Sequence, residues 1–132
     1  MKEKILRVPH HHVVMTPGQY LYFDKRGTDS PDEPVSLNLS LPLEKIYGYD
    51  PAEGLSEEEQ QYLLGVQANL WTEYIATWPH AEYMLLPRLS ALAEVGWSLD
   101  RKDYAGYLHR VRRLARIYDA CGYNYARHIF GE

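Results

Sequence analysis

The chain has 132 residues, of which 45% are apolar and 24% are charged. These proportions suit one folded globular domain and exclude wholesale disorder. The formal net charge of −4 lacks the strongly basic balance of nucleic-acid-binding proteins, so no nucleic-acid partner is expected. No apolar run reaches the length of a membrane span, and no uninterrupted apolar stretch follows the charged residues 1–4. We therefore expect neither a membrane segment nor a signal peptide.

The cysteine and aromatic contents bear on the redox compartment and on the kind of ligand. Cys121 is the single cysteine, so it forms no internal disulfide and does not indicate the redox compartment. The chain carries 12 tyrosines and 3 tryptophans but only 2 phenylalanines. Tyrosine and tryptophan combine a flat apolar body with a hydrogen-bonding tip, which suits a polar, ring-shaped ligand and equally suits an ordinary interface.

The first third of the chain favours short extended segments. Val13–Met15 is a β-prone run that ends at Pro17, and residues 19–24 are aromatic-rich and predict a short extended continuation. Residues 25–38 contain glycine, proline and many polar side chains, so we expect a surface loop there.

The middle of the chain predicts short elements. Residues 43–49 favour a brief helical turn, and Ser56 with Glu59 forms a capping-box pattern. A short helix to about Leu64, closed by Gly65, is expected to lead into a strand over residues 66–71.

Two long helices are predicted in the last third. Residues 80–97 are apolar on most sides, with Pro79 at the first helical position and a kink at Pro87. Asp100 is expected to cap a second helix of about 20 residues that Gly122 closes. Its apolar stripe consists of Tyr104, Tyr107, Leu108, Val111, Leu114 and Tyr118, and Arg110, Arg112, Arg113 and Arg116 lie on the solvated side.

The order of these elements predicts a parallel α/β arrangement. Two strands joined by a crossover of this length are naturally parallel neighbours. Two parallel strands alone leave both faces and both edges uncovered, so we expect a segment of a larger α/β sheet or barrel. A complete eight-stranded barrel typically needs about 250 residues.

Candidate functional residues follow each predicted strand. Tyr22 and Asp24 come after the first, and Trp71 and Glu73 come after the second. Ligands of parallel α/β proteins bind beyond the carboxyl ends of strands, and extended residues two apart face the same side. An aromatic face packs on the C–H side of a sugar ring while carboxylates accept bonds from its hydroxyls. The alternative is that the two aromatic residues belong to the core and the two acids merely begin solvated loops.

Longer stretches of the sequence resemble a known family. The segments 65–74 (GVQANLWTEY) and 82–98 (EYMLLPRLSALAEVGWS) resemble the carboxyl-terminal end of the catalytic barrel of family 20 glycoside hydrolases, the β-N-acetylhexosaminidases. Residues 13–17 (VVMTP) with 22–24 (YFD) look like the preceding strand. The resemblance implies an α/β fold: the last two parallel strands and helices of a (β/α)8 barrel plus a C-terminal helix. Residues 1–132 would be one partial catalytic domain, incomplete on its own and with no second domain.

The resemblance also implies a reaction and residue roles. The family removes terminal N-acetylglucosamine or N-acetylgalactosamine by retaining, substrate-assisted catalysis, in which the 2-acetamido oxygen attacks the anomeric carbon. By resemblance, Tyr22 would hold that oxygen, Asp24 and Glu73 would bind sugar hydroxyls, and Trp71 would wall the pocket. No cofactor or metal is implied. Family members are commonly secreted, periplasmic or lysosomal, and the sequence leaves the compartment unknown.

The family's general acid belongs to an Asp-Glu pair on an earlier barrel strand, preceded by His-x-Gly-Gly. Asp32-Glu33 lacks that lead-in and follows the Tyr-x-Asp element, so we interpret it as a decoy and expect little or no activity from this chain alone. The rival hypothesis is a non-catalytic α/β remnant that serves as a weak carbohydrate-binding or assembly module. The expected partners are glycans ending in N-acetylhexosamine, together with a second copy of the chain or the missing N-terminal barrel portion.

Two other signals are interpreted as unrelated to catalysis. Arg88 and Glu94 lie in an apolar helix, where buried charges need partners, so we expect salt bridges or hydrogen bonds distant from the strand ends. Residues 10–12 are consecutive histidines, but adjacent strand residues face opposite sides, which disfavours a shared metal ion.

Overall fold

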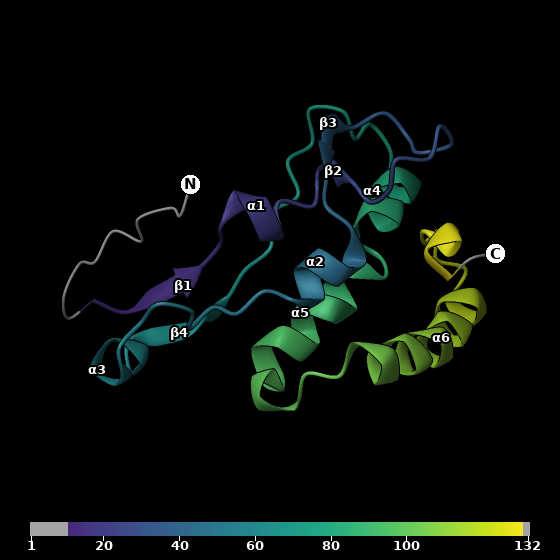
Figure 1. The fold of residues 1–132 in the computed structure, drawn as a ribbon. Helices are drawn as coiled ribbons and strands as arrows, with labels where there is room; N and C mark the ends of the chain where they lie inside the picture. The colour runs from purple at the N-terminus through teal and green to yellow at the C-terminus, as the bar shows by residue number, and fades with distance from the viewer. Residues whose placement is uncertain (1–10, 131–132) are drawn as a thin grey trace.

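The structure is a computed structural model that describes residues 11–130, and Figure 1 shows the arrangement of its elements. The strands are β1 (Val13–Met15), β2 (Lys25–Arg26), β3 (Leu37–Ser40) and β4 (Leu63–Val66). The helices are α1 (Gly18–Leu21), α2 (Leu43–Tyr47), α3 (Glu57–Gln60), α4 (Trp78–Leu85), α5 (Arg88–Trp97) and α6 (Tyr104–Cys121), with 3-10 turns at Leu99–Arg101 and Arg127–Phe130.

The strands β1 and β4 form a parallel pair, which confirms the predicted neighbours (Figure 1). Their register aligns Val14 with Gly65 and Met15 with Val66. Further along, Tyr22 forms an isolated parallel bridge with Asn69. The two segments therefore stay side by side beyond the strands, and the residues that follow them emerge at the same end.

The predicted second strand is displaced toward the N-terminus. Extended pairing covers β4 and Asn69 rather than a continuous strand over 66–71, and α3 ends at Gln60 rather than near Leu64. The capping box of Ser56 and Glu59 is confirmed. Gly65 lies inside β4 with φ of 151°, a backbone conformation that favours glycine, so it serves the strand and does not close the helix.

Two predictions for residues 19–38 are wrong. Residues 18–21 form a helical turn instead of an extended segment, because the Tyr20 and Leu21 amides donate to the Pro17 carbonyl and Leu21 is fully buried. The expected loop over 25–38 contains β2, and β3 begins at Leu37 and pairs parallel with β2. The amide of Leu41 donates to the carbonyl of Arg26 at 2.8 Å and fastens this second pair.

The predicted kinked helix over 80–97 is two helices. Leu86 is extended between α4 and α5, as the residue before a proline tends to be, so Pro87 separates the helices rather than kinking one. Thr77 caps α4, and Pro79 occupies its second position rather than its first.

Helix α6 begins later than expected. Its N-cap is Asp103, whose side chain accepts a hydrogen bond from the Gly106 amide at 3.0 Å, whereas Asp100 lies in the preceding 3-10 turn. Gly122 ends the helix in the left-handed conformation, as predicted. The buried face includes Tyr107, Val111 and Tyr118, members of the predicted stripe. The four arginines of the predicted solvated side, Arg110, Arg112, Arg113 and Arg116, are exposed.

The apolar core lies where α2 and α5 pack together beside the β1–β4 pair, with α6 adding its buried face (Figure 1). Stacked rings of Tyr47 and Tyr107, 4.7 Å apart, join α2 to α6. Glu94 of α5 accepts from Tyr47 at 3.0 Å and pairs with Arg110 at 2.7 Å, which confirms its structural role. Within residues 11–130, no helix has the length and apolarity needed to cross a membrane.

The observed cap yields a stability prediction. Replacing Asp103 with alanine removes the side-chain acceptor for the first turn of α6, and we expect the free energy of unfolding to fall by about 1 kcal/mol. The matched change Asp100→Ala is expected to stay within about 0.5 kcal/mol of the parent. Urea unfolding of both variants measures this, and a larger loss for Asp100→Ala contradicts the assignment of the cap.

Candidate functional site

The candidate site is built where the two parallel segments end. On either side of Tyr22, the Phe23 amide donates to the Asn69 carbonyl at 2.7 Å and the Asn69 amide donates to the Leu21 carbonyl at 2.8 Å. The Asn69 side chain also donates to Thr16 Oγ1 at 3.0 Å. These bonds place Tyr22 level with Asn69, so Asp24 and Trp71 each follow two residues beyond the same point.

Tyr22 and Trp71 are in direct contact. Their ring centroids are 5.8 Å apart in an edge-to-face arrangement, and the ammonium of Lys25 lies 5.9 Å from the Tyr22 ring. Gly18 packs on the other side of the phenol, where an added Cβ would lie 3.3 Å from the ring carbons. Trp71 is 48% exposed, so its indole presents open surface instead of filling the core.

Asp24 is the buried member of the group. Only 4% of the residue is exposed, and its Oδ1 atom has no hydrogen-bond partner among the described residues. Burial raises the pKa of the Asp24 carboxyl, and the charge of Glu73 adds to this increase. Its own backbone N–H, Lys25 and Arg88 lower the pKa in part.

Glu73 follows Trp71 by two residues and is exposed. Its charge is one of the causes that raise the pKa of Asp24. The alternative of core aromatics and solvated acids fits the exposed Glu73 but does not fit the half-exposed Trp71 or the buried Asp24.

Arg88 belongs to this region, which the sequence did not indicate. We expected it a helix away from the strand ends, yet its guanidinium donates to the carbonyls of Phe23 at 2.5 Å and Lys25 at 2.8 Å. The expectation of a buried charge with structural partners holds, but its distance from the site was wrong. The signal available in the sequence was a basic residue directly after Pro87 in an otherwise apolar run.

The Asp32-Glu33 pair divides between solvent and interior. Asp32 is exposed, whereas the Glu33 side chain is 5% exposed and lines a pocket with Gly27, Tyr83, Met84, Arg88, Ala126 and Ile129. This pocket is separate from the Tyr22, Asp24, Trp71 and Glu73 group.

The histidine run gives no metal site in the part that is described. His10 lies outside the described residues, and His11 and His12 are exposed. Between residues 11 and 130, no cluster of three histidine, cysteine or acidic side chains is arranged to hold a metal ion. The candidate site therefore consists of aromatic surface and carboxylates, a combination suited to a polar ring with hydroxyl groups.

The burial of Asp24 predicts a pH-dependent effect on stability. Its pKa is raised above the ordinary value of 3.8, so the native state binds the proton more tightly than the unfolded chain does. The native protein is therefore penalised progressively as the pH rises above 3.8. We expect Asp24→Asn to be more stable than the parent at neutral pH and the difference to vanish in acid.

Urea unfolding across this pH range measures the effect. Asp32→Asn is the control, because that side chain is exposed. A destabilised Asp24→Asn protein at neutral pH contradicts the inference that burial penalises the ionised Asp24 carboxyl.

Comparison with known sequences identifies relatives of the whole segment. Residues 3–100 match the family model for the catalytic domain of glycosyl hydrolase family 20. The chain is 41% identical over 118 residues to a β-hexosaminidase of Porphyromonas gingivalis, covering 87% of this chain and 15% of the relative. It is 29% identical over 115 residues to a β-N-acetylhexosaminidase of Cellulomonas fimi, covering 86% of this chain and 23% of the relative.

Solved structures of the same class share the fold. An exo-β-N-acetylglucosaminidase of Vibrio harveyi, determined with N-acetylglucosamine, superposes with a TM-score of 0.78 at 35% identity, covering 86% of this chain and 18% of that one. A β-N-acetylhexosaminidase of Streptomyces coelicolor gives 0.77 at 28% identity, covering 88% of this chain and 24% of that one. The chain thus spans less than a quarter of the length of each of these four relatives and shares their α/β architecture.

Proposed function

Because the chain belongs to glycosyl hydrolase family 20, we propose that it forms one wall of the sugar pocket of a β-N-acetylhexosaminidase. Residues 1–132 then constitute a partial catalytic domain: the last two parallel strands of a (β/α)8 barrel with their helices and a C-terminal helix. The substrate class is a glycoside with a terminal N-acetyl-D-hexosamine. Within that pocket, residues of this chain bind and orient the sugar.

The observation that carries this proposal is the buried Asp24 carboxylate, whose Oδ1 has no donor among the described residues, together with the exposed Trp71 indole. A buried carboxylate oxygen without a donor is costly, and the cost is offset when a ligand supplies the missing hydrogen bond. A sugar hydroxyl that donates to Oδ1 would also lower the pKa of Asp24 and hold the acid as the carboxylate.

Each residue has a defined part in the proposed reaction. The Tyr22 hydroxyl donates to the 2-acetamido carbonyl oxygen and holds it for attack on the anomeric carbon, which is a positioning effect. Trp71 packs on the apolar face of the ring, and Glu73 accepts a bond from a second hydroxyl. As that oxygen bonds to the anomeric carbon, the glycosidic bond breaks and its oxygen takes a proton from a general acid.

The residues at the strand ends supply no proton donor for this step. The family resemblance assigns the acid to an Asp-Glu pair on an earlier barrel strand, and Glu33 occupies a separate pocket. We therefore assign Tyr22, Asp24, Trp71 and Glu73 to substrate binding and orientation, with protonation supplied from elsewhere in a complete barrel.

A chimeric enzyme tests the assigned roles. The aligned segment of the Porphyromonas gingivalis β-hexosaminidase is replaced by residues 11–130 of this chain, and hydrolysis of a chromogenic N-acetylglucosaminide is measured. We expect Tyr22→Phe to lower kcat roughly a hundredfold, because the acetamido group loses its orientation. Asp24→Ala and Trp71→Ala are each expected to lower kcat/KM about ten- to hundredfold.

The control in the chimera is Asp29→Ala, since Asp29 is exposed and pairs with Arg26 at the surface. An active chimera whose kcat/KM is unchanged by Asp24→Ala contradicts the proposed binding role. Unequal effects of the Tyr22 and Asp24 changes on kcat and KM separate orientation from binding.

The isolated 132-residue chain is expected to show little or no glycosidase activity. Without a general acid at the sugar, glycoside cleavage loses its main source of leaving-group protonation. The same chromogenic assay on the purified chain measures this. Robust turnover that disappears in Glu33→Gln would overturn both the proposal of a partial domain and the interpretation of Asp32-Glu33 as a decoy.

A further inference from the structure

Arg88, the first residue of α5, is 2% exposed and reaches across to the segment that carries Asp24. Its Nη2 donates to the Phe23 carbonyl at 2.5 Å and its Nη1 donates to the Lys25 carbonyl at 2.8 Å. These carbonyls belong to the residues immediately before and after Asp24. The guanidinium also lies 5.1 Å from the Phe23 ring, so it contacts both the main chain and the side chain there.

The other end of the guanidinium is anchored to its own helix pair. Nε donates to the Met84 carbonyl at 2.9 Å, at the point where α4 ends. One rigid, planar group thus joins the α4–α5 junction to both main-chain neighbours of Asp24. Lysine cannot replace this fork, because its single ammonium lacks the fixed, planar set of donors.

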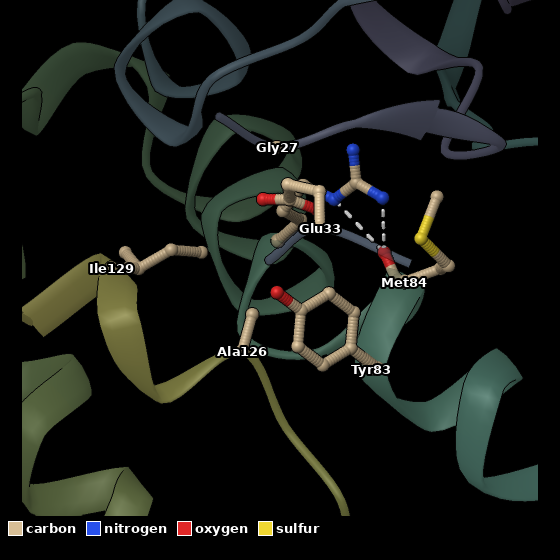
Figure 2. A pocket seen from close by; sticks show the side chains of 7 residues that line it. Gly27, Glu33, Tyr83, Met84, Ala126 and Ile129 are labelled. Carbon is tan, nitrogen blue, oxygen red and sulfur yellow. Dashed lines mark hydrogen bonds between the residues drawn. The ribbon is translucent and has the colours of Figure 1, made fainter. Parts of the chain in front are cut away.

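Glu33 is the acidic residue that shares a pocket with Arg88. Burial lowers the pKa of Arg88 to about 10, and the charges of Glu33 and Asp24 act against this decrease. Figure 2 shows Glu33 and Tyr83 pointing into the same pocket, which Arg88 also lines. Glu33 Oε1 accepts from Thr28 Oγ1 at 2.8 Å and lies 3.0 Å from His128 Nε2.

His128 continues this chain of contacts to α4. Its Nδ1 lies 3.0 Å from the Tyr83 hydroxyl, and burial raises the pKa of Tyr83 to about 12, so the phenol keeps its proton. Glu33 thus contacts Thr28 of its own loop and His128 of the C-terminal 3-10 turn. Of the Asp32-Glu33 pair, only Glu33 lies in the pocket that Arg88 lines.

The orientation of the Asp24 carboxylate depends on its surroundings. Its Oδ1 has no hydrogen-bond partner in the described part of the chain, so no side-chain contact fixes that oxygen. The direction of the carboxylate then depends on the main chain from Phe23 to Lys25. We infer that Arg88 is a positioning residue for Asp24: its fork fixes the carbonyls on both sides of the acid, with Glu33 as the buried counter-charge. The functional half of this inference rests on the proposed sugar-binding role of Asp24.

Amide hydrogen exchange of the 132-residue chain tests whether Arg88 fixes the Asp24 segment, without any sugar. Arg88→Lys keeps the charge and loses the fork. We expect exchange about ten- to hundredfold faster at the Leu37 and Leu41 amides, which donate to the Asp24 and Arg26 carbonyls. The Val111 amide in α6 is expected to be unchanged. Arg110→Lys is the matched control, because it alters an exposed pair with Glu94.

Outcomes of this experiment separate positioning from general stability. Unchanged exchange at Leu37 and Leu41, or equal acceleration throughout the chain including Val111, overturns the positioning role of Arg88. Glu33→Gln, which retains the size of the side chain, provides a milder variant and is expected to accelerate the same two amides less than Arg88→Lys does. Acceleration confined to the neighbourhood of His128 in Glu33→Gln overturns its counter-charge role.

A titration with N-acetylglucosamine tests the link to binding. We expect Arg88→Lys and Asp24→Asn each to raise the Kd, and the double variant to bind no more weakly than Asp24→Asn alone, because both changes act through one carboxylate. Fully additive effects overturn the positioning role. A parent chain that binds no sugar counts against the proposed function, and hydrogen exchange alone then decides whether Arg88 fixes the Asp24 segment.

Discussion

The main-chain hydrogen bonds around Asn69 hold two strand ends level, and the geometry of the site follows from that register. The carbonyl and amide of Asn69 bond to Phe23 and Leu21, on either side of Tyr22. Because the two segments stay in this register, the rings of Tyr22 and Trp71 meet beyond the strand ends. A shift of one residue in either segment would exchange the faces and separate Tyr22 from Trp71.

The local energetics of the site are unfavourable. Among the described residues, Asp24 Oδ1 is buried without a hydrogen-bond donor, while the Trp71 indole is half exposed. Glu94, by contrast, has both Tyr47 and Arg110 as partners, and Asp103 caps α6, although buried atoms of Arg26, Glu33, His80 and His128 also have no hydrogen-bond partner in this part of the chain. Local departures from such consistency concentrate at functional sites, where a ligand completes the missing contacts.

The sequence predicted the features that depend on local chemistry. Ser56 with Glu59 and the terminal Gly122 marked helix ends correctly, and the periodic stripe of α6 identified buried residues such as Val111. The parallel pairing followed from the length of the crossover. The position of β4 and the helical turn α1 did not, because burial of Leu21 and the conformation of Gly65 depend on contacts distant in sequence.

The candidate site was also predictable only in part. Spacing and family resemblance selected Tyr22, Asp24, Trp71 and Glu73, and Tyr22 and Trp71 meet in the structure. The place of Arg88 beside Asp24 was not predicted, because the Phe23 and Lys25 carbonyls that it binds lie more than sixty residues away, and carbonyls leave no trace in a sequence pattern. Glu33 was read as part of a polar loop, since only the fold places His128 and Tyr83 around it.

The most direct test of the account is an NMR titration that follows two side chains, the Trp71 indole N–H and the Asp24 carboxyl carbon, as N-acetylglucosamine is added. The account predicts that both signals move with one common midpoint, and that glucose, which lacks the acetamido group, moves them less at equal concentration. Signals that stay fixed at both side chains while amides elsewhere in the chain respond would contradict it.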